Sequence, residues 1–107
     1  MATEKLYTAP ILNLGSKWNE TLAINNRLYR FHFNWNVNGA DWELNISDDS
    51  DNLLVGGIRV VTIINLVDEY KEKVDFNLYV VPITDKKEIT LDNFSTDFEL
   101  VVQFYED

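Results

Sequence analysis

The single histidine of the chain, His32, carries the side chain best suited to metal binding or general base catalysis near neutral pH. It lies between Arg30 and Asn34 on the polar side of an alternating stretch. A transition-metal site needs further histidine or carboxylate ligands, which on a strand would stand two residues away. Neither position carries one, and no serine elbow or oriented base accompanies His32 for nucleophilic catalysis. We therefore expect His32 to be solvated or structural.

Acidic residues are abundant, and two arrangements of them deserve a chemical test. The run 48–52, Asp-Asp-Ser-Asp-Asn, offers oxygen ligands, but an EF-hand loop also needs a glycine and a glutamate about twelve residues from its start. Here the run enters Leu53-Leu54-Val55, so a polar hairpin tip is expected. Glycosidase-type catalysis needs two carboxyl groups, one of them in an apolar pocket. The eighteen acids are spread along the chain, as on a solvated surface. We predict no enzyme, metal or cofactor site.

Aromatic side chains offer a third kind of chemistry, because bases and sugars stack on exposed rings. Four aromatic residues recur at every second position, and a tryptophan follows them on the next apolar stretch: Tyr29, Phe31, Phe33, Trp35 and Trp42. A regular stripe that faces a second apolar strand is typical of a core. Trp18 instead lies in the polar segment 15–20, so we expect it to be the exposed aromatic residue or, alternatively, to cap one end of the barrel.

The composition is that of a small acidic domain with enough apolar material for a core. The 107 residues are 46% hydrophobic, which fits one domain over residues 1–107 and argues against disorder. Zero cysteines exclude disulfides, thiolate metal sites and cysteine nucleophiles. A net charge of −9 argues against nucleic-acid binding, which needs a concentrated basic surface. No apolar run approaches the ~20 residues of a membrane span, and the N-terminus lacks a signal-peptide core.

The alternation that carries the aromatic residues predicts a β-hairpin of defined register. Residues 29–37 are apolar at odd positions and polar at even ones, and residues 40–46 alternate in the same way. Asn38-Gly39 between them favours a two-residue type I′ turn. A one-residue slip would place each tryptophan opposite a polar side chain. The predicted turn pairs apolar residues with each other: Val37 with Ala40, Trp35 with Trp42, Phe33 with Leu44, and Phe31 with Ile46.

Further strands complete the predicted architecture. Asparagines at 25–26 favour a tight turn, and Gly56-Gly57 favours a bulge within a strand. Residues 58–64 are almost continuously apolar and β-branched, which predicts a strand buried on both sides. The remaining expected elements are an edge strand over 7–14, one or two helical turns over 68–73, strands over 76–81 and 98–105, and a turn or 3₁₀ segment over 90–94. Six or seven short strands predict an all-β domain, most simply a small antiparallel barrel.

Several stretches also match a known family in their order and spacing: Pro10-Ile11-Leu12, Asn19-Glu20-Thr21-Leu22, residues 28–36, residues 42–48, residues 53–58, Asn77-Leu78-Tyr79-Val80-Val81 and Thr90-Leu91-Asp92-Asn93-Phe94. Over most of residues 10–102 the chain resembles the baseplate plug family of contractile-tailed bacteriophages and prophages. None of these stretches is a catalytic signature. Residues 71–76 replace a glycine-containing loop of the family, and the tail at 101–107 is longer.

The resemblance implies a non-enzymatic virion protein of the tail baseplate, present in the host cytoplasm during assembly, that associates with the hub and helps to close the tail tube. It implies baseplate hub and tail proteins as partners, without membrane or nucleic-acid binding as such. The three-fold symmetry of such hubs is compatible with a trimer around the tail axis. The alternative from the residues alone is a β-barrel module that binds a ligand such as a carbohydrate.

Two sets of residues follow from this interpretation. The expected core consists of the apolar face of the hairpin: Tyr29, Phe31, Phe33, Trp35, Val37, Trp42, Leu44 and Ile46. The expected interface consists of aromatic residues not needed inside the barrel and of acids in the 48–52 loop, since exposed aromatics are good interface anchors. The interface residues are Trp18, Asp49, Asp51, Tyr70, Phe104 and Tyr105.

Overall fold

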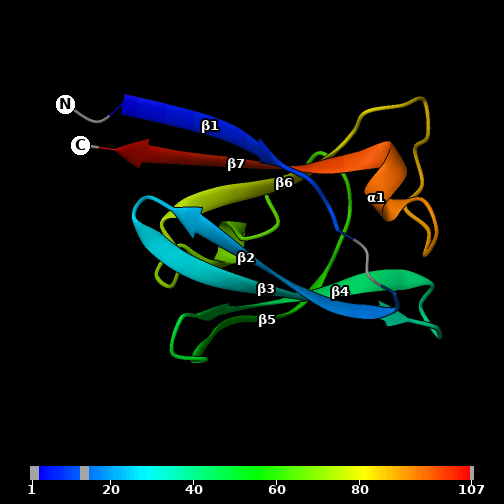
Figure 1. Cartoon of the computed structure of the whole chain (residues 1–107), viewed down its shortest axis with the longest axis horizontal. Helices are drawn as coiled ribbons and strands as arrows, with labels where there is room; N and C mark the ends of the chain where they lie inside the picture. The colour runs from blue at the N-terminus through cyan, green and yellow to red at the C-terminus, as the bar shows by residue number, and fades with distance from the viewer. Residues whose placement is uncertain (1–2, 13–14, 107) are drawn as a thin grey trace.

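The fold consists of two antiparallel β-sheets (Figure 1). The buried apolar side chains of both sheets form one core cluster. This computed structural model describes residues 3–12 and 15–106. The chain forms one strand of the first sheet, then four consecutive strands of the second, and returns to the first for its last two. The elements are β1 (Thr3–Ala9), β2 (Lys17–Ile24), β3 (Arg27–Asn36), β4 (Asp41–Asp48), β5 (Leu53–Arg59), η1 (Asp68–Tyr70), β6 (Phe76–Pro82), α1 (Phe94–Asp97) and β7 (Phe98–Glu106).

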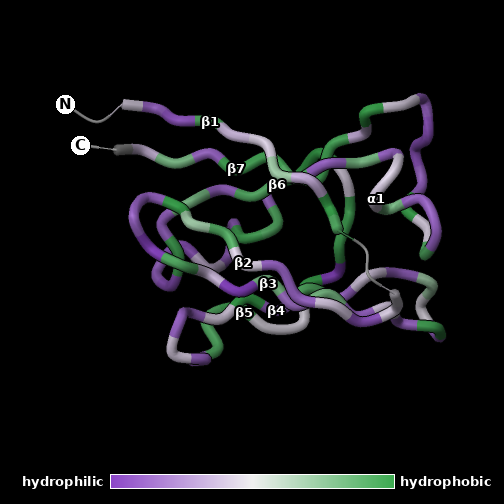
Figure 2. Tube along the Cα trace, in the orientation of Figure 1, coloured by the Kyte–Doolittle hydropathy of each residue, from purple (hydrophilic) through white to green (hydrophobic). Residues whose placement is uncertain are grey.

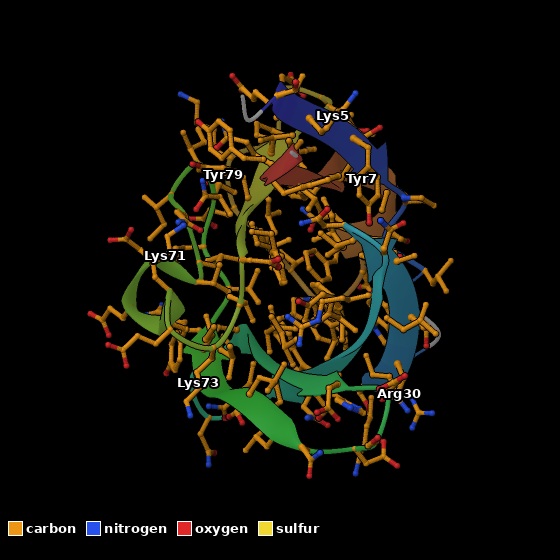
Figure 3. All side chains as sticks on the ribbon, turned by 90° about the vertical axis from the view of Figure 1, so that its left-hand side faces the viewer. Lys5, Tyr7, Arg30, Lys71, Lys73 and Tyr79 are labelled. Carbon is orange, nitrogen blue, oxygen red and sulfur yellow. The ribbon has the colours of Figure 1, made fainter. Side chains whose placement is uncertain are left out.

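The strand order is β1-β7-β6 in one sheet and β2-β3-β4-β5 in the other. Seven antiparallel strands and two very short helices within residues 3–12 and 15–106 confirm the predicted all-β class. The predicted barrel is not confirmed, because strand pairing within the described residues does not continue from one sheet to the other. A side chain bridges the sheets instead: the Tyr7 hydroxyl on β1 donates to the Ala23 carbonyl on β2 at 3.2 Å. In the end view of Figure 3, Tyr7 points from β1 toward β2.

The β3–β4 hairpin has the register that the sequence predicts. Trp35 pairs with Trp42 and Phe33 with Leu44, as expected. The turn is different, because strand pairing stops at Asn36 and four residues form the loop. The Asn36 carboxamide oxygen accepts hydrogen bonds from the backbone N–H groups of Asn38 and Gly39, at 3.1 and 3.3 Å. This side-chain cap favours the longer loop over the type I′ turn.

Val37 is the one predicted core residue that lies in this loop, and its expected burial is wrong. Its side chain is 80% exposed. Alternation assigns Val37 to the apolar face of the strand, but the ladder has already ended at the preceding residue. No strand of the opposite sheet therefore covers it. The positive φ of the loop falls on Ala40, at 52°, rather than on the Asn-Gly pair.

The other two turn signals are confirmed. Asn25 and Asn26 join β2 to β3 with φ angles of 53° and 66°, in the left-handed region that asparagine tolerates. The Gly56-Gly57 pair lies at a bulge, because β5 contains one more residue than β4 between two successive residue pairs of the ladder. Gly57 has a φ of 69°, and its N–H donates to the Asn45 carboxamide oxygen at 2.8 Å. The bulge bends β5 away from a straight ladder.

Two predicted strands differ from the structure. The strand expected over 58–64 ends at Arg59, and the chain leaves the sheet before Ile63 and Ile64. The edge strand expected over 7–14 is β1, which begins at Thr3 and ends at Ala9; residues 13–14 lie outside the described part of the chain. Pro10 follows its last residue, where a missing N–H costs no ladder hydrogen bond. The helical turn predicted over 68–73 appears as η1, and the turn predicted over 90–94 appears as a turn at residues 91–93 that leads directly into α1.

The core contains two groups of packed aromatic rings. At one end, Trp42 stacks on Phe94 of α1 with ring centroids 5.2 Å apart. At the other end, Tyr29 packs edge-on against Phe76 of β6 at 4.9 Å. Both contacts join the four-stranded sheet to elements outside it, so ring packing helps to hold the fold together. In Figure 2, the loop leading to α1 is hydrophilic along its outer run.

Candidate interaction surface

Trp18 is a core residue, and the prediction that it is exposed is wrong. Its side chain is 4% exposed and stacks on Phe33 with ring centroids 4.4 Å apart. Trp18 pairs directly with Phe33 across the β2–β3 ladder, so both point to the same face. The polar neighbours Lys17 and Asn19 point outward. A polar stretch therefore concealed a strand whose alternate residues face the core.

The predicted acidic residues lie at the tip of the β4–β5 hairpin. Asp49 is exposed, and Asp51, also exposed, forms an ion pair with Arg30 of β3. The preceding Asp48 organises the loop: its carboxylate accepts the backbone N–H groups of Ser50 and Asn52, each at 2.9 Å. These hydrogen bonds, that from Asn52 foremost, hold the pKa of Asp48 below its usual value. The run is a self-capped turn, as the sequence predicts.

The three remaining predicted interface residues are aromatic and lie in two places. Tyr70 at the end of η1 is half-buried, and its hydroxyl donates to the Gly56 carbonyl at 3.3 Å. Phe104 of β7 is half-buried on the inner face of its sheet, and Tyr105 is exposed. Asp49, Asp51, Tyr70, Phe104 and Tyr105 thus come from three separate parts of the fold, and their contact with a partner stays a prediction.

The aromatic stripe of the central hairpin does not provide a stacking platform. Its members lie inside or at the edge of the core: Tyr29, Phe31, Phe33, Trp42, Leu44 and Ile46 are buried, and Trp35 is half-buried. The Trp42 indole N–H donates to the Thr90 carbonyl at 3.2 Å, which satisfies its polar atom inside the protein. The carbohydrate-binding alternative therefore loses the side chains on which it depended.

The single histidine also has a local partner. His32 Nδ1 lies 2.6 Å from the Asn19 carboxamide oxygen on the neighbouring strand, and the pair is exposed. Among the described residues, no group of three or more His, Asp or Glu side chains is arranged to hold a metal ion.

Glu20 is a buried acid that the sequence analysis did not single out. It lies on the inner face of β2, opposite Phe31, and is 7% exposed. Burial raises the pKa of its carboxyl, and a hydrogen bond from the Leu12 backbone offsets this only in part. Its Oε1 has no hydrogen-bond partner among the described residues. Burial, and secondly the charge of Glu20, raise the pKa of Tyr7. Trp18 and Glu20 are two residues apart on one strand, so their side chains point to the same face.

One carboxylate closes the end of the molecule where β2 turns into β3. Asp75, just before β6, accepts the Tyr29 hydroxyl at 3.1 Å and the Asn25 carboxamide N–H at 3.3 Å. Burial, and after it the charge of Asp75, raise the pKa of Tyr29 to about 12. Arg27 lies over the Tyr29 ring, 5.8 Å from its centroid. This clamp ties the two sheets together through polar groups.

Polar side chains also form a ladder across the outer face of the three-stranded sheet. The Asn77 amide donates to Gln103 and the Gln103 amide to Glu4, both at 2.8 Å. Asn65, in the connection before η1, donates to Asn77 at 2.8 Å. Because these groups satisfy one another across three strands and a loop, the outer face is ordered in advance of any contact.

Ile63 and Ile64 form an exposed β-branched pair, although their sequence predicts a buried strand. Ile63 is 68% exposed and Ile64 is 56% exposed. Beside Ile64 lies a surface hollow of about 600 Å³, between the β5 bulge and η1. Its lining includes Ile58, Tyr70 and the carboxylates of Asp68 and Glu69. An apolar projection with acidic neighbours is suited to contact with another protein.

In sequence, the chain matches a family of phage structural proteins. The match is to the model described as the cyanophage Pam3 baseplate plug, gp18, and it extends over residues 11–104. The chain therefore belongs to this family of baseplate plug proteins, and the resemblance seen in its sequence is confirmed. No curated protein matches the sequence. In the described residues, no helix combines the length and apolar character needed to cross a membrane.

Proposed function

We propose that this chain is a non-catalytic plug that associates with the central hub of a contractile-tail baseplate and helps to close the tail tube. The family match over residues 11–104 carries the proposal. Its partners are then other baseplate proteins, and it acts through the shape and chemistry of its surface rather than through a reacting group. The virion is its final location, after assembly in the host cytoplasm.

The physical character of the fold supports a structural role. The buried rings of the two aromatic groups pack across both layers, which favours a rigid body over one that opens around a ligand. The Asp75 clamp and the Asn77–Gln103 ladder satisfy polar groups within the chain, so docking needs little reordering of these surfaces. Three-fold symmetry of the hub would place several copies of this chain around the tail axis, which is compatible with this role.

Co-expression with the adjacent tail genes tests the proposal. The full chain should co-purify with hub proteins and elute with them at a size larger than its own 12.5 kDa. Co-expression with tube and sheath genes without the hub is the matched control, and recovery should then fall to background. A chain that elutes alone although the hub has assembled would contradict the proposal.

A further inference from the structure

Ile63 adopts a backbone conformation that isoleucine rarely tolerates. Its φ is 69°, in the left-handed region, where the β-branched side chain crowds the backbone. Glycine or asparagine would occupy this position with less strain. Strained residues of this kind persist where the surrounding structure holds them, and they concentrate at functional sites. The strained conformation does not serve core packing, because the Ile63 side chain is exposed.

The segment that carries Ile63 and Ile64 is fastened on both sides. The Ile63 N–H donates to the Val80 carbonyl of β6 at 3.0 Å, and the Leu66 N–H donates to the Leu78 carbonyl at 2.8 Å. Between them, the Asn65 carboxamide oxygen accepts the Leu78 N–H at 3.0 Å. The segment thus lies along the free edge of β6, and the two isoleucines cannot turn inward without breaking these hydrogen bonds. An apolar pair held outward in this way loses little entropy on binding.

The charges beside this pair indicate what kind of surface would cover it. Asp68 and Glu69 line the hollow next to Ile64, and neither forms an ion pair within the described chain. Arg59, which also lines the hollow, is engaged by Asp41 at 2.8 Å. Among the residues that line the hollow, the charge without an ion-pair partner is therefore negative, which favours a positive surface opposite it.

We propose that Ile63 and Ile64 form an apolar knob that inserts into an apolar socket of a neighbouring baseplate protein, with lysine or arginine at the rim of the socket facing Asp68 and Glu69. The inference rests on the proposed function and names the contact through which this chain docks. The knob supplies the desolvated centre of the interface, and the carboxylates supply its orientation and register.

Two substitutions at the knob separate docking from folding. Ile63→Gly removes both the side chain and the strain, so the thermal midpoint of the isolated chain should rise by about 4 °C. In co-expression with the hub genes, its recovery with the hub should nevertheless fall about tenfold. Ile64→Ser should lower recovery to a similar extent without lowering the midpoint. Val37→Ser, at an exposed apolar residue elsewhere, is the matched control and should be recovered as the parent chain is.

The outcomes distinguish this inference from the function on which it rests. If both isoleucine variants co-purify as well as the parent chain does, the knob is refuted and the baseplate role stands. If the parent chain itself is not recovered with the hub, both are refuted. Neutralising the two carboxylates that face the rim, with Asp68→Asn and Glu69→Gln, should reduce recovery and weaken its dependence on salt. Unchanged recovery and salt dependence would refute the basic rim of the socket.

Discussion

Replacing Trp18 by alanine is the sharpest test of how the two sheets are held together. The indole lies against Phe33 at 4.4 Å and meets Trp42 edge-on at 6.3 Å, and Phe94 of α1 lies 6.4 Å away. It therefore links β2 to its own sheet and to the helix that leads into β7. An alanine at this position leaves a cavity bordered by three aromatic rings, which cannot collapse without moving them.

The magnitude follows from burial. A tryptophan removes up to ~250 Å² from water, which at ~25 cal/mol per Å² amounts to about 6 kcal/mol. The indole N–H has no hydrogen-bond partner among the described residues, and this unpaired buried donor costs about 1–3 kcal/mol in the parent protein. Alanine removes both contributions, so the net loss in the free energy of unfolding should be about 4 kcal/mol. The thermal midpoint should fall by about 15 °C for a domain of this size.

Thermal and urea unfolding followed by circular dichroism measure this loss. Trp18→Phe is the informative companion, because it keeps a ring on Phe33 and removes the unpaired N–H; it should cost about 1 kcal/mol or less. Val37→Ala, at an exposed residue, should leave the midpoint within the error. The reasoning is refuted if Trp18→Ala loses less than about 1 kcal/mol, or if Trp18→Phe is as damaging as Trp18→Ala.

Three further predictions concern the Asp75 clamp and the buried acid Glu20. Tyr29→Phe should lower the free energy of unfolding by about 1–2 kcal/mol, because Asp75 loses its half-buried donor; an unchanged urea midpoint would contradict the clamp. In Asp75→Asn, spectrophotometric titration should show the pKa of Tyr29 falling from about 12, since the neighbouring charge is gone. Glu20→Gln should stabilise the protein, increasingly as pH rises above 4.5, because the raised pKa of Glu20 means that folding disfavours its charged form. The burial of the charge would be refuted if the difference in free energy of unfolding between the parent protein and Glu20→Gln does not change with pH.

The central hairpin shows how far local sequence carries a fold. Trp35 and Trp42 pair as the alternation predicts, because only one register places every apolar residue of two adjacent strands on one face. The asparagine turn and the Gly57 bulge were equally readable, since a positive φ restricts the residue types that fit. Family membership was readable as well, from the order of stretches that span both sheets.

The exposure of the candidate docking residues could not be predicted from local sequence in this way. Ile63 and Ile64 have the composition of a buried strand, and their exposure depends on the hydrogen bonds that hold the segment along the edge of β6. Glu20 could be assigned to the inner face of β2 only once Trp18 was known to belong to that strand. The exposure of the isoleucines and the burial of Glu20 both depend on strand partners more than ten residues away in sequence.

The amino-acid sequence by itself determined the all-β class, the register of β3 with β4, and the family to which the chain belongs. Only the tertiary structure decided that Trp18 is covered, that Val37 is not, and that two isoleucines project from the edge of β6. The physical reason is that period-two patterning states on which side of its own strand a residue lies. Whether that side meets the opposite sheet or water depends on where each ladder ends and what crosses above it.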